Sequence, residues 1–274
     1  MATTIIKQGQ PGSKAWFKDS FLLHKLHSLS GVMPIGFFMI FHLTANSYSL
    51  RGATEFNTAV KAISYAPFVI LLEIFVIAIP ILFHAIYGIF IAMEMQGPGG
   101  NTSYYGYQRN WLYVLQRWSG VVAFAYILWH TWDTTFFKYG YELTQGEAGH
   151  ELGFRAISYD AMAWRMAQPW YLAMQITGVT AAAFHLGNGV LNFAIRWGIA
   201  IGRDAQRIAA GIGWLLGLGL TGLGVLIAVN FAINGQKLHQ TYPTLDSLIR
   251  TQIEQQKAVS QTPSSSSHTV VRAN

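Results

Sequence analysis

Long apolar stretches constrain what this chain of 274 residues can fold into more than any other feature. Five of them run approximately over residues 28–47, 67–93, 111–137, 169–195 and 208–233. About 20 apolar residues in a helix, rising about 1.5 Å each, cross the hydrocarbon core of a bilayer. Only 11% of the residues are charged, against roughly 25% in soluble domains. Backbone groups inside lipid must be satisfied within their own segment, so these stretches predict membrane-spanning helices.

We therefore predict an all-α membrane protein with a bundle of five transmembrane helices over residues 27–234. A cytoplasmic N-terminal segment, 1–26, is expected before the bundle, and a polar, disordered tail, 235–274, after it. Lys and Arg near the helix ends are more frequent on the side of the N-terminus, which predicts a cytoplasmic N-terminus. Residues 1–26 show no cleavable signal peptide, so the first helix is expected to direct insertion.

The charge balance and the absence of cysteine exclude several functions. The formal net charge of +6 follows from the expected topology, and no basic cluster indicates nucleic-acid binding. Without cysteine the chain cannot form disulfides, ligate an iron–sulfur cluster through thiolates or attach a c-type haem covalently. Any iron–sulfur cluster that serves this chain must therefore belong to a partner.

Four histidines lie in the later halves of the first four apolar stretches: His42, His84, His130 and His185. Consecutive helices alternate in direction, so His84 and His185 are expected at an inner level, and His42 and His130 at an outer level. We call them the inner pair and the outer pair. Two pairs at two depths match the axial ligands of two b-type haems. Gly88 and Gly189, four residues after two of the histidines, are expected to leave room for the flat macrocycles.

Other interpretations of these features remain open. Each histidine could instead hydrogen-bond to a neighbouring helix. Zinc fits less well, because the histidines fall at two levels and the inner pair has no nearby carboxylate. A GxGxxG pattern at Gly217, Gly219 and Gly222 lies inside an apolar stretch, which favours close helix packing over a dinucleotide site. A transporter or a haem-free assembly protein is the alternative from another functional class.

Several motifs together resemble one known family. The stretches LHSLSGVMPIGFFMIFHLTAN, YQRNWLYVLQRWSGVVAFAYILWHTWD and FHLGNGVLNFAIRWGI are similar to the Bacillus-type cytochrome b subunit of succinate dehydrogenase. The wider family includes the dihaem anchors of fumarate reductases. The resemblance runs from about His24 to Arg207. The N-terminal extension, the long connection between the third and fourth stretches, and the Ser-rich tail depart from it.

The resemblance implies a function. The inner pair would bind the haem proximal to flavoprotein and iron–sulfur subunits docked on the cytoplasmic face of a bacterial inner membrane, and the outer pair would bind the distal haem. Electrons from succinate would pass to a quinone, usually menaquinone in such relatives. His27, Ser28 and Arg196 would contact haem propionates, whereas His24 is expected at the surface. An anchor of a quinol:fumarate reductase, or of another respiratory complex such as nitrate reductase or hydrogenase, is the alternative.

Two carboxylates are candidates for quinone-linked proton transfer. Glu73 lies eleven residues before His84, which places it roughly 16 Å further toward the outer face. Asp133 follows His130 by three residues. A carboxylate in an apolar helix is costly unless it is paired or protonated, so such residues are functional candidates. The structural alternatives are an interhelical hydrogen bond for Glu73 and an interfacial cap for Asp133.

Overall fold

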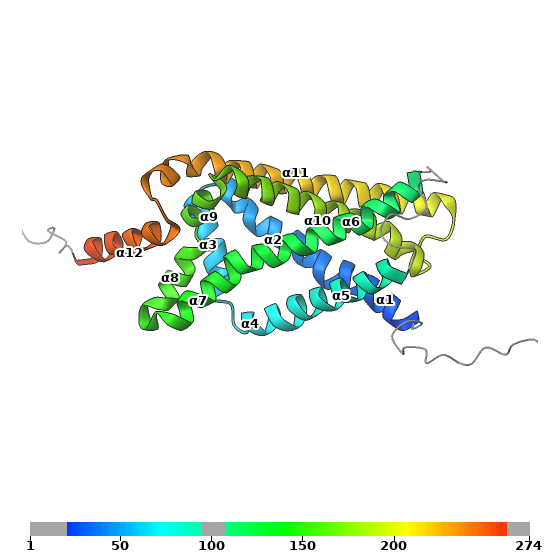
Figure 1. The fold of residues 1–274 in the computed structure, drawn as a ribbon, viewed down its shortest axis with the longest axis horizontal. Coiled ribbons are helices and arrows are strands. Elements are labelled where there is room, and N and C mark those ends of the chain that lie inside the picture. Colours follow the sequence, from blue (N-terminus) through cyan, green and yellow to red (C-terminus); the bar gives the residue numbers. More distant parts are fainter. Residues whose placement is uncertain (1–20, 95–107, 262–274) are drawn as a thin grey trace, which may run out of the picture.

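The computed structural model describes residues 21–94 and 108–261, and every regular element within these ranges is helical. Residues 1–20, 95–107 and 262–274 fall outside the described part, and with them most of the expected N-terminal segment and the Ser-rich end of the tail. Long helices, which we name I to V, lie side by side along the described bundle (Figure 1). Helix I comprises α1 (Phe21–Ser30), a π-helical segment (Gly31–Gly36), α2 (Phe37–Asn46) and a 3-10 turn (Ser47–Leu50); helix II comprises α4 (Val69–Leu72), a π-helical segment (Glu73–Ala78) and α5 (Ile79–Glu94); helix III comprises α6 (Gln108–Thr131), a π-helical segment (Trp132–Phe136) and α7 (Phe137–Thr144); helices IV and V are α10 (Pro169–Arg196) and α11 (Arg203–Thr241).

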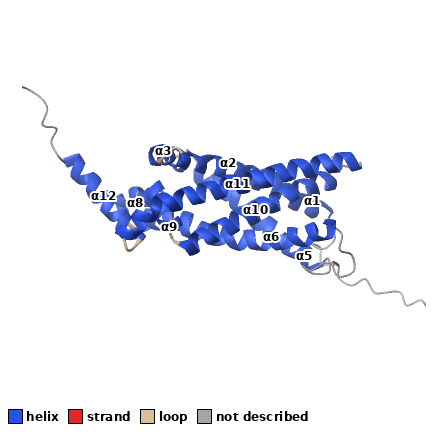
Figure 2. Cartoon of the chain, turned by 90° about the horizontal axis from the view of Figure 1, so that it is seen from above, coloured by secondary structure: helices blue, strands red, loops and turns tan. Residues whose placement is uncertain are grey.

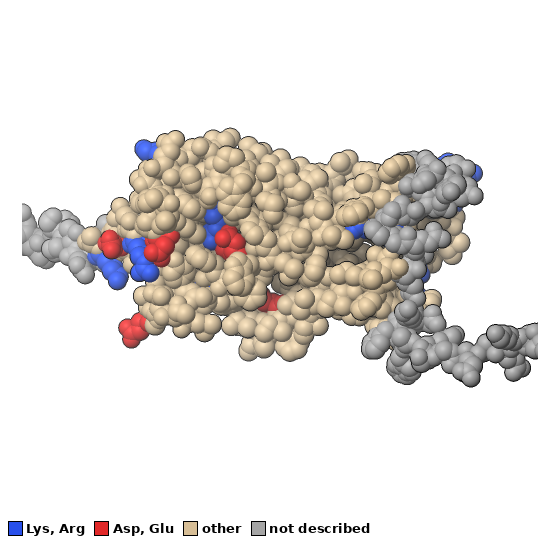
Figure 3. Space-filling model, in the orientation of Figure 1, with Lys and Arg blue, Asp and Glu red and all other residues tan. Residues whose placement is uncertain are grey.

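Three of these helices are long and apolar enough to cross a membrane: Phe21–Leu50, Val69–Met93 and Arg203–Thr241. Large apolar side chains stand exposed along them, as at Phe75 and Leu215. Soluble monomers rarely expose extended apolar surface, so these faces fit a lipid environment. Charged side chains gather toward the ends of the bundle, and the surface between them is largely uncharged (Figure 3).

Helices III and IV have the length to cross a membrane, with 24 residues in α6 and 28 in α10, but neither contains a segment apolar enough to count as a candidate span. Part of the reason is that their polar side chains face each other inside the bundle. Asn188 of helix IV donates a hydrogen bond to the side-chain oxygen of Gln116 of helix III at 2.7 Å. Polar groups paired in this way are tolerated between membrane helices, and they lower the mean hydropathy without exposing polar atoms to lipid.

Prolines accompany the widened turns of helices I and II. Pro34 lies inside the π-helical segment Gly31–Gly36, and Pro80 follows the segment Glu73–Ala78 by two residues. Proline has no N–H to donate, and its ring collides with the carbonyl one turn earlier. A local π-helical adjustment relieves that collision within a membrane helix. Glu73 begins the second widened segment, beside the site described below.

Glycines bring helices IV and V into close contact. A Cβ atom built on Gly213 would lie 2.2 Å from the carbonyl oxygen of Gly187, and one on Gly217 would lie 3.6 Å from the Gly187 Cα. The expected packing role is therefore right for Gly217. It is wrong for Gly219 and Gly222, where an added Cβ would meet nothing within 4 Å. These two glycines face away from the neighbouring helices.

Short helices cover the end of the bundle opposite the start of helix I (Figures 1 and 2). They are α3 (Ala53–Ser64), α8 (Gly149–Ala156), α9 (Tyr159–Met166) and α12 (Leu245–Gln261), with a 3-10 turn (Gly146–Ala148) before α8. The expected disorder after residue 234 is wrong for residues 235–261, because helix V continues to Thr241 and α12 follows. Apolar residues of α12 recur at helical spacing, and Leu248 and Ile249 are 1% and 0% exposed at the end of the bundle.

Candidate functional site

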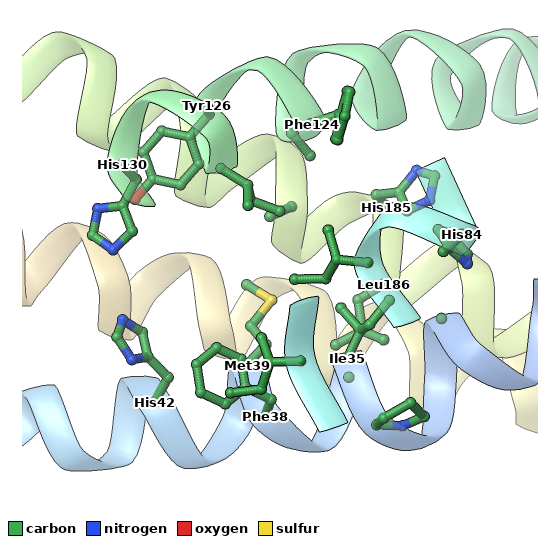
Figure 4. A pocket seen from close by; sticks show the side chains of 18 of the residues that line it. Ile35, Phe38, Met39, His42, His84, Phe124, Tyr126, His130, His185 and Leu186 are labelled. Atoms are coloured by element: carbon green, nitrogen blue, oxygen red, sulfur yellow. The ribbon is translucent and has the colours of Figure 1, made fainter. Parts of the chain in front are cut away.

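One large cavity runs through the bundle and is lined by all four predicted histidines (Figure 4). Its volume is about 2450 Å³. Ordinary ligand pockets hold roughly 300–1,000 Å³, so this space can take more than one sizeable ligand. Figure 4 shows His42 and His130 facing each other at one end, and His84 and His185 at the other. Apolar side chains such as Met39 lie between the two ends.

The histidines pair as expected. The ring centroids of His84 and His185 are 6.0 Å apart, and so are those of His42 and His130. Two imidazoles bonded to opposite sides of one metal ion, each at about 2 Å, have ring centroids roughly 6 Å apart. Each pair thus has the spacing of two axial ligands. Each of helices I to IV contributes one of the four histidines.

Backbone carbonyls hold both rings of the inner pair in a single tautomer. The Nδ1 of His84 lies 2.8 Å from the carbonyl oxygen of His27, and the Nδ1 of His185 lies 2.9 Å from that of Gln116. A carbonyl only accepts, so each Nδ1 carries the proton and each Nε2 keeps its lone pair. The Gln116 amide nitrogen, a donor, lies 3.4 Å from the Nε2 of His185, in agreement with this tautomer. A second nitrogen anchored in this way is usual for a metal-binding histidine.

Glycines make the space for these two rings. A Cβ atom on Gly31 of helix I would lie 2.4 Å from the Cε1 of His84, and one on Gly120 of helix III would lie 2.8 Å from the Cε1 of His185. The preceding serines, Ser30 and Ser119, place their hydroxyls 3.4 and 3.3 Å from the corresponding Nδ1 atoms. Helix I therefore receives the histidine of helix II in the same way that helix III receives the histidine of helix IV.

The sites at Gly31 and Gly120 share a sequence pattern that was not used to predict them. Both contain the dipeptide Ser-Gly, in HSLSG and in QRWSG, and its glycine follows by four residues the residue whose carbonyl holds the ring. Gly88 and Gly189, which were expected to leave room for macrocycles, do line the cavity. Each has a protein neighbour: a Cβ on Gly88 would lie 3.0 Å from the Nε2 of His27, and one on Gly189 would lie 3.8 Å from the Gln116 amide.

The outer pair is held by aromatic rings instead of carbonyls. Tyr126, one turn before His130, stacks on it with centroids 5.5 Å apart, and Phe38 lies one turn before His42 at 5.3 Å. The Tyr126 ring fills the space left by Gly178, where a Cβ would lie 2.0 Å from it. The buried Nδ1 of His130 has no hydrogen-bond partner among the described residues. An unpaired buried nitrogen beside a cavity is the kind of group that a ligand satisfies.

Residues at the inner end of the cavity include the three expected propionate contacts, His27, Ser28 and Arg196. The His27 ring stacks on His84 with centroids 4.1 Å apart. Ser28 accepts a hydrogen bond from the Trp197 indole at 3.0 Å, and Arg196 is exposed. His24, which was expected at the surface, is partly exposed, and its Nδ1 lies 3.0 Å from the hydroxyl of buried Tyr87.

The two candidate carboxylates have different surroundings. Glu73 lines the cavity and accepts a hydrogen bond from the Tyr139 hydroxyl at 2.7 Å. Asp133 turns away from the cavity. Its carboxylate lies 2.7 Å from the Nε of Arg165, a residue 2% exposed, and accepts a hydrogen bond from the Tyr171 hydroxyl at 2.8 Å. Asp133 therefore joins helix III to α9 and helix IV, whereas Glu73 faces the space a ligand would enter.

The donor set of the cavity favours a metal ion that brings other ligands with it. No group of three His, Cys, Asp or Glu side chains in the described residues could hold a bare metal ion. A structural zinc site needs four protein ligands and a catalytic one needs three. Two facing imidazoles supply only two. The geometry fits an iron whose equatorial positions are filled by a flat macrocycle, and the cavity between the pairs has the room for it.

These features define a class of membrane-embedded helical bundles in which paired histidines face each other across an internal cavity. No protein-family model matches the chain. A protein of Bacillus subtilis (strain 168), the succinate dehydrogenase cytochrome b558 subunit, is 37% identical to it over 205 residues. The match covers 75% of this chain and 94% of the Bacillus protein. The chain belongs to the family of succinate dehydrogenase cytochrome b subunits, as the sequence motifs indicated.

Proposed function

We propose that this chain is the membrane-anchor cytochrome b subunit of a succinate:quinone oxidoreductase, or complex II. It crosses the cytoplasmic membrane five times, with its N-terminus inside, and holds two haems b. The observation that carries the proposal is the pair of facing imidazoles, 6.0 Å between centroids, at each end of one cavity. A pair of imidazoles fills the two axial positions of a six-coordinate haem iron.

The chain's own residues bind and orient these groups. His84 and His185 would hold the proximal haem, because their Nδ1–H···O=C bonds leave each Nε2 unprotonated and able to bind a metal ion. His27, Ser28 and Arg196 stand at the edge of that site, where donors and a cation suit propionates. When bound, the two haems supply one-electron carriers between a partner's iron–sulfur cluster and a membrane quinone, proposed to be menaquinone.

Flavoprotein and iron–sulfur partners are proposed on the cytoplasmic face, at the end of the bundle that holds the inner pair. The absence of cysteine supports such a partner, because this chain cannot build an iron–sulfur cluster with its own thiolates. Quinone chemistry is assigned to the opposite end, where Glu73 can hold a proton at its carboxylate beside the Tyr139 hydroxyl. Asp133 is not retained in this role, because Arg165 and Tyr171 occupy its carboxylate.

A haem assay on the complex purified with its partners tests the proposal. We expect two b-type haems per chain in reduced-minus-oxidised spectra, and both should be reduced by succinate. A preparation of the intact complex that contains no haem, or whose haem succinate cannot reduce, contradicts the proposed function.

Substituting Gly31 by alanine is expected to remove the proximal haem alone. The added methyl would lie 2.4 Å from the His84 ring, and the backbone of helix I cannot yield easily, so the imidazole must rotate away from the iron. Haem content per chain should fall from two toward one. Gly219→Ala is the matched control, because a Cβ there meets nothing within 4 Å. Two haems in Gly31→Ala would show that the His84 ring tolerates displacement.

A further inference from the structure

A polar cluster links the outer end of the cavity to the surface, and the proposed function does not account for it. The cluster consists of Glu73, Lys138, Tyr139, Glu142 and His150. The first four of these line the cavity, and the His150 side chain is 63% exposed. The residues come from helix II, from α7 at the end of helix III, and from α8, which the fold brings together.

Lys138 is the unusual member of this cluster. It is 6% exposed, and its Nζ lies 3.7 Å from the Oε1 of Glu142 and 4.6 Å from the centroid of the Tyr139 ring. A buried ammonium is costly unless a carboxylate and further acceptors compensate it. An ammonium has three N–H donors, and one carboxylate at this distance does not occupy them all. Lys138 therefore has N–H groups that can donate to a ligand in the cavity it lines.

Glu142 continues the cluster outward. Its Oε1 lies 3.4 Å from the Nδ1 of His150, but it makes no hydrogen bond within the described residues although the atom is buried. A small side-chain motion would close the distances of 3.4 Å to His150 and 3.7 Å to Lys138 into hydrogen bonds. Gly153 of α8 permits the arrangement, because a Cβ there would lie 2.7 Å from the Cγ of Glu142. Tyr65 packs beside His150 at 4.6 Å between ring centroids.

We propose that His150, Glu142 and Lys138 form a proton-entry route from the outer surface to a quinone held at Glu73 and Tyr139. The inference rests on the proposed function. Reduction of one quinone takes two electrons and two protons, and converts its two carbonyls to hydroxyls. The electrons originate from succinate through the partner subunits, and both protons come from water at the outer surface. Glu142 receives each proton at its carboxylate and restores the Lys138 ammonium, which donates to the quinone oxygen directly or through Glu73.

The test uses the whole complex in proteoliposomes, with a short-chain naphthoquinone as electron acceptor. Glu142→Gln keeps the size of the side chain but cannot carry a proton. The rate of quinone reduction should fall at least about tenfold, because positioned proton transfer contributes about 10²–10⁴-fold to rates. Reduction of the haems by succinate should stay unchanged. Glu147→Gln is the matched control, since Glu147 is an exposed acid of the same connection and lies outside the cluster.

Two further measurements separate proton entry from a structural role. Formate added only to the outer compartment should restore part of the Glu142→Gln rate, because a small acid can carry the missing proton. Formate would not restore the rate if the substitution had only disturbed packing. His150→Gln should lower the rate several-fold, and its exposed position leaves the fold intact. A wild-type rate in both variants overturns the inference. It is also overturned if Glu142→Gln loses both quinone reduction and haem while His150→Gln keeps the wild-type rate. Failure of succinate to reduce haem in the wild type contradicts the proposed function instead.

Discussion

Alanine in place of His84 is expected to remove one of two haems, and alanine in place of His185 should remove the same one. Loss of either axial ligand leaves the iron with one imidazole inside a cavity whose walls offer few other donors. His42→Ala and His130→Ala should each remove the other haem. Quinone reduction by succinate should fall more than about 100-fold in all four variants, beyond the 10–100-fold typical of changes to the groups that only orient a ligand.

Spectra of the purified complexes decide the outcome. The two haems differ in surroundings, because carbonyls anchor the inner pair and aromatic rings flank the outer pair, so their absorption bands and potentials should be separable. His239→Ala is the control, since His239 packs near Trp164 at 5.2 Å between ring centroids and does not line the cavity. Loss of one and the same haem in His84→Ala and His42→Ala would overturn the pairing.

Arg165→Met is expected to destabilise the protein by about 3 kcal/mol, which is the lower end of the cost of breaking a buried ion pair. Arg165 is 2% exposed and carries the pair with Asp133, and it also donates to the carbonyl oxygens of Ala156 and Asp133 at 2.7 and 2.8 Å. The lower end applies because the Asp133 side chain is 30% exposed and keeps the Tyr171 hydrogen bond. Thermal unfolding in detergent should shift downward by roughly 10 °C.

Arg155→Met provides the comparison, because Arg155 is partly exposed and pairs with Glu151 one turn away in α8 and with the exposed Gln256 of α12. A change of about 1 kcal/mol is expected there. The double variant Arg165→Met with Asp133→Leu should recover part of the stability, since no unpaired charge remains. Recovery should be incomplete, because two carbonyls lose their donor. If the Arg165→Met protein is as stable as the Arg155→Met protein, the contacts of Arg165 with Asp133 and Ala156 do not stabilise the fold. Normal quinone reduction in the double variant would further separate Asp133 from proton transfer.

The histidine pairs illustrate how far one-dimensional reasoning reaches. Apolar length predicts helices, and alternating direction places the later halves of odd and even helices at opposite ends. Those two facts bring His42 to His130 and His84 to His185, as the structure has them. They need no knowledge of neighbours, because helix rise converts sequence position directly into depth.

Helix length and direction do not predict which side chains meet across two helices. Asp133 and Glu73 look alike in sequence, each a carboxylate within or beside an apolar stretch. The fold gives Asp133 a buried arginine from α9, thirty-two residues away, and gives Glu73 a tyrosine from helix III. Likewise, Leu248 and Ile249 appear as apolar residues scattered in a polar tail until α8 and α9 supply a surface for them. Rotation of a helix about its axis, which depends on its neighbours, determines such partners.

The sequence alone was sufficient for the membrane class and for the pairing of the four histidines at two levels, because hydropathy and helix rise are properties of the chain itself. The carbonyl anchors of His84 and His185, the glycines that admit their rings and the cluster around Lys138 follow from packing between segments distant in sequence. Depth is set by position along one helix, whereas orientation and hydrogen bonding require at least two.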